Sequence, residues 1–219
     1  MKKINLITIL SLVLFINACE RPFNFGCLTP EGNVEVRTID FNEFDKISSN
    51  IDADIFITEG DVQSVVIETQ SNIIDRIIDD SSVRNDELRL EVNGCLDMGN
   101  NNPIIVRITM SSLAGLKIEG DANIETVGRF NNVSDLVLDI NGDGKNFLLL
   151  GDTIDLLSLD INGNGDVTCR GRAQELYIQI NGDGEVYFFD IPSEEVRVNI
   201  QGEGNCELNV TEKLQINID

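Results

Sequence analysis

One short pattern decides the fold, and it occurs four times: Leu136-Val-Leu-Asp-Ile-Asn-Gly-Asp-Gly144, Leu157-Ser-Leu-Asp-Ile-Asn-Gly-Asn-Gly165, Leu176-Tyr-Ile-Gln-Ile-Asn-Gly-Asp-Gly184 and Val196-Arg-Val-Asn-Ile-Gln-Gly-Glu-Gly204. In each copy apolar residues alternate with mostly polar ones, which is the period of a strand with one buried face. The glycine-rich end predicts a turn, because glycine adopts positive φ at little cost. Measured between the central isoleucines, the copies lie 21, 19 and 20 residues apart.

This spacing favours a β-solenoid, in which each coil buries its apolar face against its neighbours. A weaker copy precedes the four at residues 116–124, and residues 214–218 form a last strand. An antiparallel meander would also alternate, but it gives no reason to repeat one turn sequence at near-constant spacing. We therefore expect an all-β, right-handed parallel β-helix with coils of about 20 residues, right-handed because parallel connections take that hand.

The amino-terminal half is less regular and suggests a second sub-module that shares the stacked core. Alternation predicts strands at 55–57, 65–67, 88–92 and 104–108, and four isoleucines at helical spacing predict a short helix over 71–80. Gly99, three asparagines and Pro103 predict an exposed loop. The expected organisation is a lipoprotein signal peptide (1–18), a tether (19–33), an amino-terminal β sub-module (34–110) and the regular solenoid (111–219).

The first residues predict export and a lipid anchor. Two lysines precede a mainly apolar stretch over residues 4–16, which is shorter than the roughly 20 residues that span a bilayer. Ile16-Asn-Ala-Cys19 resembles the bacterial lipobox, which implies cleavage before Cys19 and acylation of that residue, for example with palmitate. An ordinary signal peptide with a nearby cysteine is the alternative. We expect an outer-membrane, lipid-anchored protein that faces the periplasm or the exterior.

Composition excludes several classes of function. The formal net charge is −22, so the surface repels phosphate backbones and nucleic acid is not an expected partner. Histidine is absent from the sequence, which removes the commonest general base and most zinc sites. No catalytic residue is expected.

Residues from about 35 to 219 resemble the head GIN domain family of autotransporter adhesins, found often as lipoproteins in Bacteroidetes. The resemblance rests on Phe44-Asp-Lys-Ile47 and on the glycine-rich strand repeats that end at Gly144, Gly165, Gly184 and Gly204. The family more often has serine between the glycines, where this chain has asparagine, aspartate or glutamate. The resemblance implies a right-handed parallel β-helix and an adhesion role.

The turns contain the only candidate metal ligands that the repeat suggests. Asp139 to Gly144 matches the first half of an EF-hand loop, but Leu150 occupies the position of the bidentate glutamate, so that interpretation fails. Stacked coils would align one row of turn residues with the oxygen ligands for loose binding of Ca²⁺: Asp143, Asn164, Asp183 and Glu203. The favoured alternative is that these acids face solvent while a second row forms a side-chain hydrogen-bond ladder: Asn141, Asn162, Asn181 and Gln201. No other cofactor is expected.

Four cysteines remain after Cys19, an even number for an oxidising compartment. Cys27 and Cys95 both lie in Gly-Cys-Leu contexts outside the repeat, and we expect them to form a disulfide. Cys169 and Cys206 lie at apolar positions of coils too far apart for a bond, and we expect both in the core.

These features predict a non-enzymatic envelope lipoprotein. A binding or adhesion module for a glycan or a protein ligand is the first hypothesis, based on the architecture. A structural component of the envelope, or a subunit of an envelope assembly, is the second. A carbohydrate-active enzyme with paired carboxylates is the third, and the short uniform turns disfavour it because they build no cleft.

Overall fold

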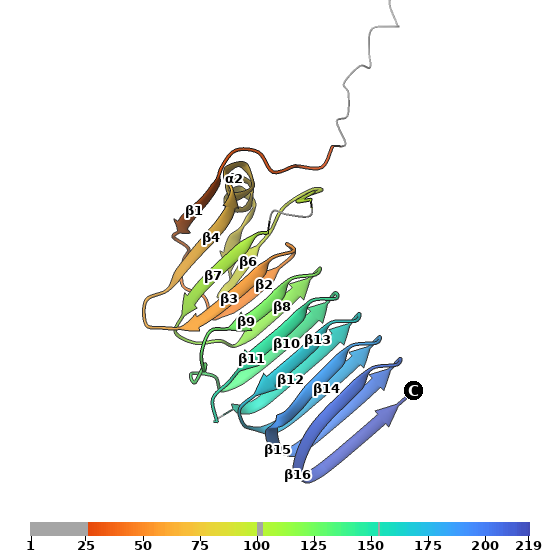
Figure 1. Ribbon diagram of the computed structural model, residues 1–219. Coiled ribbons are helices and arrows are strands. Elements are labelled where there is room, and N and C mark those ends of the chain that lie inside the picture. Colours follow the sequence, from red (N-terminus) through yellow and green to blue (C-terminus); the bar gives the residue numbers. More distant parts are fainter. Residues whose placement is uncertain (1–25, 100–102, 153) are drawn as a thin grey trace, which may run out of the picture.

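The computed structural model describes residues 26–99, 103–152 and 154–219 and forms a nearly all-β solenoid with one short helix (Figure 1). The predicted parallel β-solenoid is confirmed. The elements in chain order are β1 Val34–Ile39, β2 Lys46–Ser49, β3 Asp54–Glu59, β4 Ser64–Gln70, α2 Ser71–Asp80, β5 Ser82–Arg84, β6 Glu87–Leu90, β7 Ile105–Met110, β8 Gly115–Glu119, β9 Asn123–Thr126, β10 Asp135–Asn141, β11 Lys145–Leu149, β12 Ile154–Asn162, β13 Asp166–Arg170, β14 Ala173–Asn181, β15 Glu185–Gln201 and β16 Asn205–Ile218.

Each regular coil contributes one strand to each of two faces. The repeat face contains β8, β10, β12, β14 and the second parts of β15 and β16, and the return face contains β9, β11, β13 and the first parts of β15 and β16. Pairing is parallel and in register, so Ile140, Ile161, Ile180 and Ile200 lie on successive strands. All four are buried. The alternation in the sequence thus becomes rows of aliphatic side chains in one dry interior.

The amino-terminal coils do not stack in chain order. β2 pairs in parallel with both β6 and β8, and β3 pairs in parallel with both β7 and β9. The coil formed by residues 46–59 therefore lies between the coil that contains β6 and β7 and the coil of residues 115–126. The boundary that the sequence predicts at residue 110 falls between β7 and β8. The inserted coil, β2 and β3, pairs with strands on both sides of this boundary.

One end of the solenoid is capped. β1 and β4 extend the return face in antiparallel pairing beyond β7, and β5 does the same for the repeat face beyond β6. Helix α2 has the bounds that the sequence predicts and buries Ile73, Ile74 and Ile77 completely. Figure 1 shows α2 and the carboxyl-terminal strand at opposite ends of the solenoid. The cap covers the first coil with apolar side chains, as terminal units of a repeat protein must.

The turns need glycine because adjacent coils approach each other closely. A Cβ on Gly182 would lie 2.3 Å from the carbonyl oxygen of Gly163, and Gly182 also has a φ of 140°. A Cβ on Gly144 would lie 1.9 Å from the carbonyl oxygen of Ala122. The sequence suggested positive φ as the reason for the glycines; close backbone contact between coils is the second reason.

Within the described part, no helix has the length and apolarity needed to cross a bilayer. The expected signal peptide, Cys19 and the start of the tether lie outside the described residues, as do the three asparagines of the expected loop.

Candidate functional site

Hydrogen bonds between adjacent coils hold the row of turn residues predicted to line up: Asp143, Asn164, Asp183 and Glu203. An Asp143 Oδ1 accepts the backbone N–H of Asn164 at 3.2 Å and its side-chain amide at 3.1 Å. Asp183 Oδ1 accepts the backbone N–H of Glu203 at 3.3 Å. Asp143 in turn donates its own N–H to Asp121 Oδ1 at 3.3 Å. These carboxylates therefore cap backbone donors of the next coil, which accounts for acidic residues in the turns.

The described residues contain no group of three or more histidine, cysteine, aspartate or glutamate side chains placed to hold a metal ion. Cation binding by Asp143, Asn164, Asp183 and Glu203 stays a prediction, which a calcium titration followed by calorimetry would decide. The hydrogen-bond ladder expected along Asn141, Asn162, Asn181 and Gln201 forms only in part. Asn181 Nδ2 donates to Asn162 Oδ1 at 2.8 Å, as in a ladder, whereas Asn162 Nδ2 donates to Asp160 on its own strand at 3.0 Å.

Asp139 and Asp160 face each other on adjacent strands of the repeat face. The pKa of Asp160 is raised, mainly by partial burial and then by the charge of Asp139, while a hydrogen bond from Asn162 lowers it. The two carboxylates therefore repel each other. Among the described residues no third acidic, histidine or cysteine side chain joins them as a ligand for a metal ion.

Cys27 and Cys95 form a disulfide with a Cα–Cα distance of 4.5 Å, beside a parallel bridge between Leu28 and Leu96. Cys169 is a buried thiol, and Cys206 is a half-buried one. Burial raises the pKa of both thiols, to about 11 for Cys206. The disulfide attaches the end of the tether to the capped end of the solenoid.

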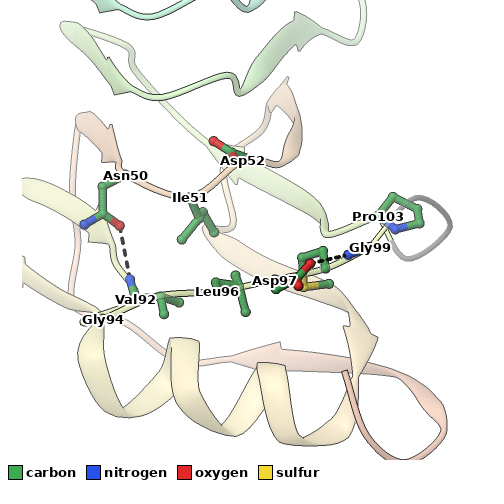
Figure 2. Close-up of a pocket in the computed structure, with 10 residues that line it drawn as sticks. Asn50, Ile51, Asp52, Val92, Gly94, Leu96, Asp97, Gly99 and Pro103 are labelled. Carbon is green, nitrogen blue, oxygen red and sulfur yellow. Dashed lines mark hydrogen bonds between the residues drawn. The ribbon is translucent and has the colours of Figure 1, made fainter. Parts of the chain in front are cut away.

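A hollow of about 820 Å³ lies beside this disulfide, between residues 50–52 and 92–99 (Figure 2). Its polar side chains are engaged by backbone donors. Asn50 Oδ1 accepts the N–H of Val92 at 3.1 Å, Asp97 Oδ1 accepts the N–H of Gly99 at 3.1 Å, and Asp52 Oδ1 accepts the N–H of Asp121 at 3.0 Å. The geometry gives these residues a structural role in holding the loops.

A groove of about 440 Å³ on the outer side of the return face is the better candidate site. The parallel register places five outward side chains in one row across adjacent strands: Phe56, Glu125, Phe147, Thr168 and Tyr187. Strands in a sheet lie about 4.8 Å apart, so aromatic rings recur about 9.6 Å apart along the groove. The three rings are half-buried.

Polar groups border this aromatic row on one side. The neighbouring row contains Asp54, Asn123, Lys145 and Asp166, and all four line the groove. Asn123 Nδ2 donates to Asp54 Oδ1 at 2.9 Å, and Asn123 Oδ1 accepts the backbone N–H of Lys145 at 2.9 Å. These bonds fix the carboxylate and the amide in place.

Two further contacts fix the rings. The hydroxyl of Tyr187 donates to Glu185 Oε2, and this hydrogen bond is the main reason that the pKa of Tyr187 rises to about 12. The guanidinium carbon of Arg170 lies 5.5 Å from the centroid of the Phe147 ring, and Arg170 also pairs with Asp190 at 3.2 Å. The row thus offers preorganised aromatic side chains with charged and hydrogen-bonding neighbours, and Arg170 covers one face of the Phe147 ring.

The model of the family described as "Putative auto-transporter adhesin, head GIN domain" matches residues 43–219. This chain belongs to the head GIN domain family. Among solved structures, a "putative adhesin" from Bacteroides fragilis NCTC 9343 is 22% identical and aligns with a TM-score of 0.79 over 87% of each chain. No curated protein matches the chain.

Two more distant structures resemble this head GIN domain in fold. A "putative adhesin" from Parabacteroides merdae ATCC 43184 is 18% identical, with a TM-score of 0.63 over 87% of this chain and 95% of the other. A "putative lipid binding protein" from Parabacteroides distasonis ATCC 8503 is 15% identical, with a TM-score of 0.58 over 88% and 98%. At these identities the likeness shows the fold alone.

The aromatic groove of the head GIN domain was missed from the sequence. Phe147, Thr168, Tyr187 and Glu207 each follow their aligned isoleucine by seven residues. This constant offset is the signal that would have placed them in one row. Phe56 could not be found in the same way, because its coil is inserted out of chain order.

Proposed function

We propose that this head GIN domain is a non-enzymatic adhesion module of the cell envelope that binds a glycan along the aromatic groove. The observation that carries the proposal is the row of rings on alternate strands, with Glu125 and Thr168 between them. Membership in an adhesin family supports a location in the envelope or at the surface.

A glycan fits the chemistry of this groove better than other polymers. Aromatic faces pack against the apolar C–H face of a pyranose ring, and the bordering carboxylates, amide and lysine suit the exchange of hydrogen bonds with hydroxyl groups. The net charge of −22 disfavours polyanions. Recurrence of the rings about 9.6 Å apart suits an extended chain of several sugars that crosses the strands.

The proposed anchor at Cys19 gives this module its orientation. The described chain enters at the capped end, where Cys27 is bonded to Cys95. A lipid at Cys19 would hold that end near the outer membrane and leave the groove accessible beyond it. Labelling cells with palmitate, with Cys19→Ser as the negative control, tests the anchor, and protease treatment of intact cells tests exposure.

A glycan array followed by calorimetry on the best-bound oligosaccharide tests the ligand. We expect Phe147→Ala to weaken affinity by about tenfold or more, or ~1.4 kcal/mol, because it removes the central platform. Tyr177→Ala is the matched control, since Tyr177 is exposed on the repeat face. Absence of any bound glycan, or equal losses in both variants, would contradict the proposal and favour a structural role in the envelope.

A further inference from the structure

Acidic side chains alternate with the rings of the aromatic groove. In register across adjacent strands, Glu125 lies between Phe56 and Phe147, and Glu207 follows Tyr187. Strands lie about 4.8 Å apart, so Glu125 has an aromatic side chain one strand away on each side. Phe56, Glu125 and Phe147 all line the groove. An anion flanked by aromatic side chains is the composition of sites that bind organic cations.

The carboxylate of Glu125 is free to take a partner. Glu125 is exposed, and its side chain makes no hydrogen bond or ion pair among the described residues. Other carboxylates beside the groove are engaged. Asp54 accepts the amide N–H of Asn123 at 2.9 Å. Glu185 accepts the hydroxyl of Tyr187. Of these acids, Glu125 alone can therefore pair with a positive group from outside without losing a contact.

The charges that line the groove favour a cation. Three acids line it, Asp54, Glu125 and Asp166, against one base, Lys145. The register places Lys145 beside Asp166 on the next strand, so its charge is offset close by. The net charge of −22 adds long-range attraction for cations to this local excess of acids.

The arginines that border the row already have acidic partners. Arg107, in the same row on β7, pairs with Glu68 at 2.8 Å. Arg170, over the ring of Phe147, pairs with Asp190 at 3.2 Å. Each guanidinium charge is thus offset locally, and the acids that line the groove stay in excess.

The far end of the row has the same acidic character. The pKa of Tyr187 is raised mainly by its hydrogen bond to Glu185. The negative charges of Asp166 and Glu207 raise it further. Three carboxylates therefore act on one ring, and the negative potential extends along the groove rather than being confined to Glu125.

We infer that the ligand of the aromatic groove is a cationic glycan, a chain of hexosamines with free amino groups, and that Glu125 selects it by pairing with one ammonium group between Phe56 and Phe147. This inference rests on the proposed glycan-binding function and names the class of sugar. The rings pack against the apolar faces of the sugars, and the carboxylate binds the charge that an N-acetyl group would remove. Glu125 is thus a specificity-determining residue.

Calorimetry with two oligosaccharides of the same backbone tests the charge. The probes are a chitosan hexasaccharide, with free amines, and its fully N-acetylated counterpart, in a weakly acidic buffer that keeps the amines protonated. We expect the chitosan form to bind at least about tenfold more tightly, and added salt should shrink this preference because it screens charge pairs. Equal binding of both, or tighter binding of the acetylated form, overturns the inference.

Glu125→Gln tests the residue itself. The substitution keeps the shape and removes the charge, so it should lower the preference for the chitosan form about fivefold. Glu175→Gln is the matched control, because Glu175 is exposed on the repeat face, makes no side-chain hydrogen bond or ion pair in the described structure, and changes the net charge equally. The same loss in both variants would show that only the net charge matters and would refute the role of Glu125.

The glycan array separates a failure of this inference from a failure of the proposed function. If neutral or carboxylated glycans are the best ligands and Phe147→Ala weakens their binding, the groove binds glycans and the inference alone is wrong. A preference for carboxylated glycans would assign the selecting charge to Lys145 instead of Glu125. If neither hexasaccharide binds and the array is empty, both proposals fail.

Discussion

Asp143 and Asn164 are joined across two adjacent coils, because a carboxylate oxygen of Asp143 accepts both the backbone and the side-chain N–H of Asn164. This contact explains an acidic turn in an already acidic protein, since the charge satisfies a backbone donor that the parallel ladder does not reach.

Asp143→Ala should lower the free energy of unfolding by about 1–2 kcal/mol, because it removes hydrogen bonds to a charged acceptor. Chemical denaturation measures the change. Asp135→Ala is the control, since Asp135 is exposed and makes no side-chain hydrogen bond or ion pair in the described part of the chain. Equal stability of the two variants would show that the turn contact contributes nothing.

Gly182→Ala should destabilise the protein severely, on the order of 3 kcal/mol or more, through backbone strain and a clash with the preceding turn. The added Cβ would lie 2.3 Å from the carbonyl oxygen of Gly163. Gly128→Ala isolates the strain, because Gly128 has a φ of 86° and no atom within 4 Å of its Cβ position. We expect about 1 kcal/mol there. Similar losses at both positions would argue against close coil contact as the cause.

Asn146→Val should raise the free energy of unfolding by about 1 kcal/mol. Asn146 is 5% exposed, and its side-chain oxygen has no hydrogen-bond partner in the described structure. It occupies an interior row beside Ile124 and Val167, so valine fits the surroundings and removes a buried unsatisfied oxygen. The bonds that valine loses are long, since Nδ2 donates to the carbonyl oxygens of Gly144 at 3.4 Å and Asp166 at 3.3 Å. Thermal unfolding measures the effect, with Val167→Asn as the reverse change. A less stable Asn146→Val would mean that the amide is needed in the core.

Glu59 should contribute stability that acid removes. The backbone N–H of Asn131 chiefly lowers the pKa of this carboxyl, against a smaller effect of burial, and Asn132 adds a second backbone donor. Because the folded pKa lies below the unfolded value of about 4.3, the contribution is present above that pH and disappears as pH falls through the folded pKa.

The stability difference between wild type and Glu59→Gln, measured by denaturation from neutral to acid pH, should therefore shrink on acidification. Glu43→Gln serves as the reference substitution, since Glu43 makes no side-chain hydrogen bond or ion pair among the residues described. A difference that stays constant with pH would refute the role of the charge.

The sequence predicted the regular half well because its repeats are local. Alternation over 136–144 and its copies set the buried rows, and the constant spacing set the register that Ile140 shares with Ile161. The bounds of α2 followed from isoleucine spacing. The place of β2 and β3 could not be predicted, because it depends on pairing between segments separated by up to 69 residues, as between Ile55 and Ile124. For the same reason the complete aromatic row, which includes Phe56 of β3, could not be predicted from the sequence.

The inserted coil at residues 46–59 constrains the order in which the protein folds. Both of its flanking coils come from later parts of the chain, since β6 and β7 cover one side and β8 and β9 the other. The solenoid therefore cannot grow coil by coil from its amino-terminal end. Its first stable nucleus must wait until about residue 126 is available, after which the four later repeats can add one at a time onto a finished template.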